Sequence, residues 1–109
     1  MTGRAAYNLP GLASPDALAP DLVRTGKLFF SSGIRGVNRT TGELPSDPAE
    51  QFRNAWQNLA ALVDGAGFSP DNLGLVTNFI DSQDYRAYIN SGWLELFPER
   101  DNRPARETG

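Results

Sequence analysis

Apolar side chains recur at helical spacing between residues 47 and 67, and this is the strongest pattern along the chain. Asp47 is a residue type that accepts hydrogen bonds from free amides at a helix start, and Pro48 suits the first helical position. Gly65 and Gly67 mark the helix end. The apolar positions between these signals are Phe52, Ala55, Trp56, Leu59, Ala60, Leu62, Val63 and Ala66. The pattern predicts one helix with a wide apolar face that packs on a sheet.

A second helical pattern follows in the last third of the chain. Asp81 or Ser82 is placed to cap it, and Pro98 stops it. Its apolar side chains again fall on one side, at Tyr85, Tyr88, Ile89, Trp93, Leu96 and Phe97. This predicts a second amphipathic helix.

Shorter apolar runs predict strands around and between these helices. Leu22 to Phe30 holds two apolar runs separated by a Thr-Gly turn, which is typical of a hairpin. Gly74 to Ile80 is rich in β-branched and aromatic residues, as strands are. Residues 8–20 contain three prolines among small residues, so we expect residues 1–20 to form an irregular lead-in.

The order strand pair, helix, strand, helix predicts an α+β fold in which two helices cover one face of a sheet. With 109 residues, the chain fits a single domain over residues 1–109. The opposite face of the sheet then needs another cover, and self-association is the simplest source.

Composition limits the classes of function. Hydrophobic residues make up 39% and charged residues 21%, which argues against disorder. The net charge of −3 and the isoelectric point near 4.8 disfavour nucleic acid as a partner. No apolar run reaches the ~20 residues of a membrane span. The start lacks a stretch of signal-peptide length, so we expect a cytoplasmic protein.

Cysteine and histidine are both absent. This excludes Ser-His-Asp and Cys-His nucleophiles, thiolate zinc sites and histidine metal centres within one chain.

Three segments carry candidate site residues: Arg106 after Pro104-Ala105, Ser32 in a Ser-Ser-Gly segment, and Asn90 in the second helix. An arginine presents a rigid fork of donors that binds a carboxylate with two parallel hydrogen bonds. Taken singly, each residue also has a structural interpretation: a solvated charge, a serine that satisfies its own strand end, and an exposed helical asparagine.

Together these segments resemble the RidA (YjgF/YER057c/UK114) family of enamine and imine deaminases, over most of residues 20 to 108. The resemblance implies hydrolysis of reactive 2-imino acids or enamines to 2-keto acids and ammonia, with no metal, cofactor or covalent nucleophile, which fits a chain without Cys and His. It implies that Arg106 binds the substrate carboxylate, that Ser32 and Asn90 contact the substrate, and that Thr108 contacts the attacking water. It also implies a YjgF-like (Bacillus chorismate mutase-like) mixed sheet with two helices on one face, assembled as a homotrimer with sites between subunits.

The sequence departs from the family pattern in three places. Asp21 follows Ala19-Pro20 where family members often carry Gly-Pro-Tyr, and Ile34 stands where glutamine is common. Family chains also continue beyond the arginine with a strand, a turn and a final strand that bears a glutamate. Gly109 ends this sequence first, so the C-terminal strands are expected to be absent.

In the family's sheet the final strand lies inside, between the strands that correspond here to Leu28–Ile34 and Leu75–Ile80. Without it, both edges are expected to carry unpaired backbone groups. Two hypotheses follow: the sequence is truncated, or the protein borrows the strand from a partner.

Three functions stay open on the sequence. The first is a 2-iminobutanoate/2-iminopropanoate deaminase-like hydrolase. The second is a non-catalytic protein that binds small carboxylates, which the missing tyrosine and glutamate favour. An endoribonuclease comes third, because the chain is acidic and lacks an aromatic or basic RNA platform.

Overall fold

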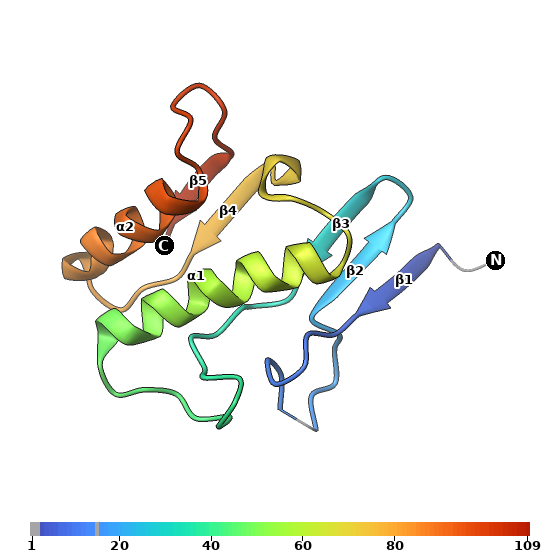
Figure 1. Cartoon of the computed structure of the whole chain (residues 1–109), viewed down its shortest axis with the longest axis horizontal. Helices are drawn as coiled ribbons and strands as arrows, with labels where there is room; N and C mark the ends of the chain where they lie inside the picture. The colour runs from blue at the N-terminus through green and yellow to red at the C-terminus, as the bar shows by residue number, and fades with distance from the viewer. Residues whose placement is uncertain (1–2, 15) are drawn as a thin grey trace.

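The computed structural model describes residues 3–14 and 16–109 and confirms the α+β class (Figure 1). Its strands are β1 (Arg4–Tyr7), β2 (Leu22–Thr25), β3 (Leu28–Ser31), β4 (Leu75–Asn78) and β5 (Ala105–Thr108). Its helices are α1 (Pro48–Gly65), α2 (Arg86–Leu96) and two short 3-10 turns, η1 (Pro70–Asn72) and η2 (Gln83–Tyr85).

The strands form two separate sheets. β1, β2 and β3 pair antiparallel in that order, while β4 and β5 pair parallel. The predicted hairpin is confirmed: Thr25 lies opposite Leu28, and Gly26 takes a φ of +61° in the turn between them. A positive φ suits glycine because it has no Cβ.

Two sequence predictions need correction at the ends of the chain. The irregular lead-in expected over residues 1–20 contains β1, which pairs with β2 over Arg4–Tyr7. The C-terminal strands expected to be absent begin before Gly109, because Ala105–Thr108 already forms β5 beside β4. Both strands are short and lack strong alternation, so the backbone pairing with a neighbour decides their conformation.

β3 and β4 are not paired with each other. This agrees with the expectation that both edges carry unpaired backbone groups. Within the part of the chain that the structure describes, no strand lies between them. Helix α1 runs past both sheets and connects them (Figure 1). A cavity therefore opens between the two edges, above α1.

Helix α1 begins as predicted. The Asp47 carboxylate accepts a hydrogen bond from the Ala49 N–H at 3.2 Å, and Pro48 is the first helical residue. The helix ends before Gly67, whose φ is +87°. Leu62 and Val63 on its apolar face are fully buried.

The core lies where α1 meets the antiparallel sheet. Its buried members are Leu9, Leu12, Leu22, Val37 and Leu62. The rings of Phe29 on β3 and Phe68 after α1 stack with centroids 3.9 Å apart at the edge of this cluster. Burial of these side chains is the main force that holds the lead-in and the first sheet against α1.

Helix α2 packs on α1 through aromatic side chains. Ile89 and Trp93 of α2 are buried, and Trp93 meets Trp56 of α1 edge to face at 6.3 Å. A Cβ on Gly92 would come within 2.1 Å of the Trp56 ring, so this close approach requires glycine. Of the two caps proposed, Ser82 accepts from Asp84 N–H and caps η2, and α2 itself begins at Arg86.

No helix in the described ranges, 3–14 and 16–109, has the length and apolar character needed to cross a membrane.

Candidate active site

Arg106 and Asn90, which the family resemblance assigned to one site, lie in direct contact. Arg106 is the second residue of β5 and points to the face that carries the helices, where α2 presents Asn90. The Arg106 Nη2 donates a hydrogen bond to Asn90 Oδ1 at 2.6 Å. This bond accounts for one donor of the guanidinium and fixes its orientation while other donors stay available.

The Trp93 ring also contacts the same guanidinium. The Arg106 Cζ lies 5.3 Å from the centroid of the Trp93 ring, within the range of a cation–π contact. Phe97 packs edge to face on Trp93 at 4.8 Å and helps hold the ring in place. The sequence pattern places Trp93 only on the apolar face of the second helix. The signal that could have found it is its place one helical turn from Asn90.

Arg106 has no carboxylate partner. Among the residues that the structure describes, no Asp or Glu forms an ion pair with it. The side chain is half-buried, and its neighbours Asn90 and Trp93 carry no charge. A guanidinium held this way is prepared to bind an anion with the donors that Asn90 leaves free.

Thr108 lies two residues beyond Arg106 and therefore on the same face of β5. Its partner in the parallel ladder is Asn78 of β4. The Asn78 Nδ2 is buried and has no hydrogen-bond partner within the described residues. Asn78 is not among the sequence predictions, because the sequence does not show that this amide lacks a hydrogen-bond partner. The pair therefore adds a free amide donor beside Thr108.

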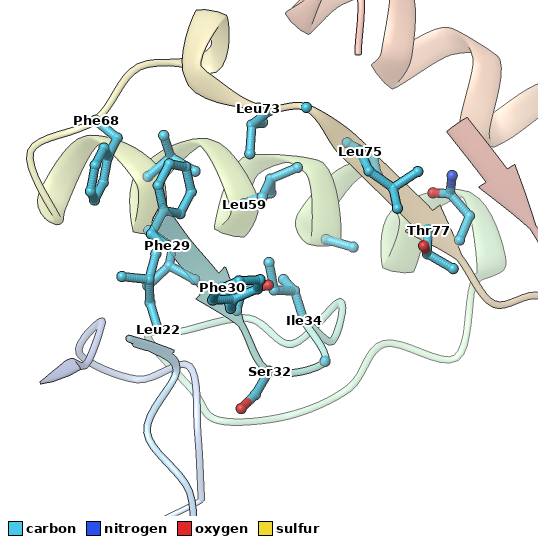
Figure 2. Close-up of a pocket in the computed structure, with 18 of the residues that line it drawn as sticks. Leu22, Phe29, Phe30, Ser32, Ile34, Leu59, Phe68, Leu73, Leu75 and Thr77 are labelled. Atoms are coloured by element: carbon cyan, nitrogen blue, oxygen red, sulfur yellow. The ribbon is translucent and has the colours of Figure 1, made fainter. Parts of the chain in front are cut away.

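Ser32 lies elsewhere in the chain. Its hydroxyl donates to the Pro20 carbonyl at 2.8 Å, and Figure 2 shows the side chain pointing away from the cavity. β3, which precedes it, is separated from β5 by the cavity and by β4. One chain thus brings together Arg106, Asn90 and Thr108, and it does not bring Ser32 to them.

Asp21 occupies the position where the family resemblance leads one to expect a tyrosine. Its side chain is buried, and its Oδ2 accepts a hydrogen bond from the Leu9 N–H at 2.8 Å. The Asp21 N–H in turn donates to Asn8 Oδ1 at 3.0 Å. Asp21 therefore holds the loop that leads into β2 in place, and its carboxylate is already hydrogen-bonded to the Leu9 N–H.

The described residues hold no cluster of three or more Asp, Glu, His or Cys side chains placed to bind a metal ion.

Comparison with known proteins adds a family assignment to this geometry. Residues 13–108 match the family model described as endoribonuclease L-PSP. The chain is 32% identical over 103 residues to the 2-iminobutanoate/2-iminopropanoate deaminase of Escherichia coli K12, covering 94% of this chain and 78% of that protein. It is 33% identical over 98 residues to a RutC family protein of Pasteurella multocida, with coverages of 90% and 73%.

Solved structures agree with the sequence matches. The crystal structure of the YjgF gene product of E. coli superposes with a TM-score of 0.82 at 26% identity, over 96% of this chain and 84% of that one.

Proposed function

The chain belongs to the RidA (YjgF/YER057c/UK114) family, and from this premise we propose that it hydrolyses small reactive 2-imino acids, and the enamines that exchange with them, to 2-keto acids and ammonia. One observation carries the proposal. Arg106 is held by Asn90 and Trp93, yet no carboxylate of the described residues neutralises it. This arrangement suits a small substrate with a carboxylate beside its reactive carbon.

The reaction needs little from the protein besides orientation. Arg106 binds the substrate carboxylate, and Thr108 positions a water molecule through its hydroxyl and carbonyl oxygen. Water adds to the electrophilic imine carbon, a proton moves to the nitrogen, and the carbon–nitrogen bond breaks to give the ketone and ammonia. Positioning of the two reactants supplies much of the acceleration in such a step.

We further propose that the active protein is a homotrimer with its sites between subunits. The sheet face without helices exposes large apolar side chains: Leu28, Phe30 and Leu75 are each more than half exposed. Apolar surface of this kind marks an interaction site in a folded protein. Assembly would also supply Ser32 from another subunit, since Ser32 and Arg106 lie apart in one chain.

A charged substitution on the sheet face without helices tests the proposed homotrimer. Phe30 is 56% exposed, so Phe30→Lys leaves the single-chain fold intact but places an ammonium where subunits meet. We expect the concentration needed for assembly to rise about tenfold or more, because apolar burial is lost and a charge is desolvated. Sedimentation velocity measures the masses. Leu94→Lys, at a 53% exposed position on α2, is the matched control and should retain the trimer. A wild-type chain that stays single at high concentration would contradict the proposal.

A coupled assay tests the chemistry itself. 2-Iminopropanoate or 2-iminobutanoate is generated enzymatically, and ammonia release is followed with and without the protein. We expect the protein to accelerate release above the rate of spontaneous hydrolysis. Equal rates at all protein concentrations would remove the deaminase proposal.

The second candidate is a protein that binds small carboxylates without catalysis. One observation favours it: Asp21, where the family often places a site tyrosine, is fully engaged in fastening a loop. This candidate predicts no ammonia release, together with carboxylate binding in calorimetry that Arg106→Ala abolishes.

A further inference from the structure

Two hydrogen bonds fix how α2 lies along β5 and the residues just before it. The Arg106 Nη2 donates to Asn90 Oδ1 at 2.6 Å, and the Arg103 Nε donates to the Phe97 carbonyl at 2.9 Å. A step from Arg106 back to Arg103 thus corresponds to a step from Asn90 forward to Phe97. The two lengths agree, because each segment spans ~10 Å in its own conformation. The helix and the strand therefore run in opposite directions, as Figure 1 also shows.

The same register extends to the other end of β5. Thr108 lies two residues beyond Arg106, which is ~7 Å farther along the strand. On α2 the same distance is a little more than one helical turn, or about four residues before Asn90. That position is Arg86, the first residue of the helix. Arg86 therefore lies at the Thr108 end of the candidate site.

Arg86 also lies on the side of α2 that faces β5. Side chains three or four residues apart share one face of a helix. Asn90 and Trp93 both contact Arg106, so these contacts show which face of α2 is turned toward the strand. Arg86 precedes Asn90 by four residues and continues the same row of side chains toward the start of the helix.

The Arg86 guanidinium is exposed and not neutralised by a carboxylate. Its Nε donates to Gln83 Oε1, which is an uncharged group. Among the residues that the structure describes, no Asp or Glu forms an ion pair with Arg86. The acidic residue nearest in sequence is Asp84, two positions earlier, and residues two apart on a helix do not face each other. The terminal nitrogens of Arg86 therefore stay available to an anion.

The candidate site thus contains two guanidinium groups about one helical turn apart along α2. A 2-imino acid with an apolar side chain has only one carboxylate, and Arg106 accounts for it in the proposed reaction. A second free guanidinium in the same row suits a substrate whose side chain ends in another acidic group.

We propose that Arg86 makes this site selective for 2-imino dicarboxylic acids, an inference that rests on the proposed imine hydrolysis. Arg106 binds the carboxylate beside the imine carbon, and Arg86 binds the carboxylate of the side chain. The carbon chain of the substrate then runs along β5 from Arg106 toward Thr108. Water adds to the imine carbon and the carbon–nitrogen bond breaks, which gives a 2-oxo dicarboxylic acid and ammonia. The second carboxylate is unchanged.

Two imines of matched size test the selectivity. Enzymatic oxidation of aspartate generates 2-iminosuccinate, and oxidation of asparagine generates its uncharged amide. We expect kcat/KM for ammonia release to be about fivefold or more higher for the acid at low ionic strength, because a bidentate arginine–carboxylate pair favours it although the site is exposed. The preference should shrink as salt is added, since salt screens exposed charges.

Arg86→Gln removes the charge and keeps a polar side chain with good helix propensity. It should bring the ratio of the two kcat/KM values close to one. Arg100→Gln is the matched control, because Arg100 is exposed and follows the opposite end of α2. This control should keep the wild-type ratio.

Calorimetry provides a readout that does not depend on catalysis. Its probes are 2-oxoglutarate and 2-oxopentanoate, which have the same chain length and differ by the second carboxylate. The wild type should bind 2-oxoglutarate about fivefold or more tightly than 2-oxopentanoate. Arg86→Gln should bind both with similar affinity.

The outcomes separate this inference from the proposed function. Accelerated hydrolysis of both imines with equal kcat/KM, or with a preference that Arg86→Gln retains, would overturn the role of Arg86 and leave imine hydrolysis standing. If neither imine is hydrolysed faster than in the absence of protein, the deaminase proposal fails, and calorimetry alone decides the role of Arg86. Equal affinity of the wild type for the two oxo acids would then overturn it.

Discussion

Replacement of Arg106 by lysine is expected to lower kcat/KM for a 2-imino acid about 10- to 100-fold, since a charge-assisted bidentate pair contributes ~1.5–3 kcal/mol. Lysine keeps the positive charge but has no planar fork, and its ammonium cannot bond to Asn90 and grip two carboxylate oxygens in the same geometry. Its contact with the Trp93 ring also changes, because an ammonium does not stack. The lysine variant therefore keeps the positive charge but no longer orients the substrate.

Initial rates of ammonia release over a range of imine concentrations measure this effect. Arg106→Ala removes charge and fork together, so its loss should exceed that of the lysine variant. Arg100→Lys is the matched control, because Arg100 is exposed in the loop before β5 and makes no contact with Asn90 or Trp93. It should retain wild-type rates.

The kinetic constants distinguish how Arg106 acts. A higher KM with unchanged kcat indicates that the guanidinium holds substrate and transition state equally. A fall in kcat indicates that it places the imine carbon for attack. Wild-type kcat/KM in both Arg106 variants would contradict a carboxylate-binding role.

The features of the fold that could be predicted from sequence are those encoded by neighbouring residues. Asp47 and Pro48 at the start of α1 and the turn at Gly26 each act within a few residues, so their outcome does not depend on the rest of the molecule. Arg106 and Asn90 were assigned to one site only by resemblance to a family, and their hydrogen bond was not predicted. No local pattern connects two residues on β5 and α2.

The features that were missed depend on distant pairing. β1 forms because Arg4–Tyr7 lies against β2, although the prolines that follow it indicated an irregular segment. Trp93 has the pattern of a core residue. Its contact with Arg106 depends on where β5 packs, which the residues near Trp93 do not encode. The buried Asn78 amide has no hydrogen-bond partner among the described residues, and a sequence alone does not show this.

Asn58 is a further buried polar residue that the helical pattern did not reveal. It lies on the inner face of α1 and is 4% exposed. Its Nδ2 donates to the carbonyls of Arg35 at 2.9 Å and Val37 at 3.1 Å. The same loop presses on the helix, because a Cβ on Gly36 would come 2.1 Å from the Gln51 carbonyl oxygen. One amide thus holds the segment that follows Ser32 against α1.

Asn58→Asp is expected to lower the free energy of unfolding at neutral pH by about 3–5 kcal/mol. The change keeps the size of the side chain, but it replaces two donors with a buried carboxylate that faces two carbonyl oxygens. Since ~1 kcal/mol moves the melting temperature of a domain this size by ~4–8 °C, the loss is about 12 °C or more. Thermal unfolding followed by circular dichroism measures it.

Gln57→Glu is the matched control, because the same amide-to-carboxylate change falls on the exposed side of α1 and should alter stability by only ~0.5 kcal/mol or less. Unfolding measurements at acidic pH separate the effect of the introduced charge from the effect of the side-chain shape. Burial raises the pKa of the introduced carboxyl in the folded state, so the destabilisation is full at neutral pH and shrinks as pH falls through that pKa. Part of the loss remains in acid, since a protonated carboxyl donates one hydrogen bond where the amide donates two. If Asn58→Asp instead melts within a few degrees of Gln57→Glu at neutral pH, the loop after β3 is held by its apolar contacts and not by Asn58.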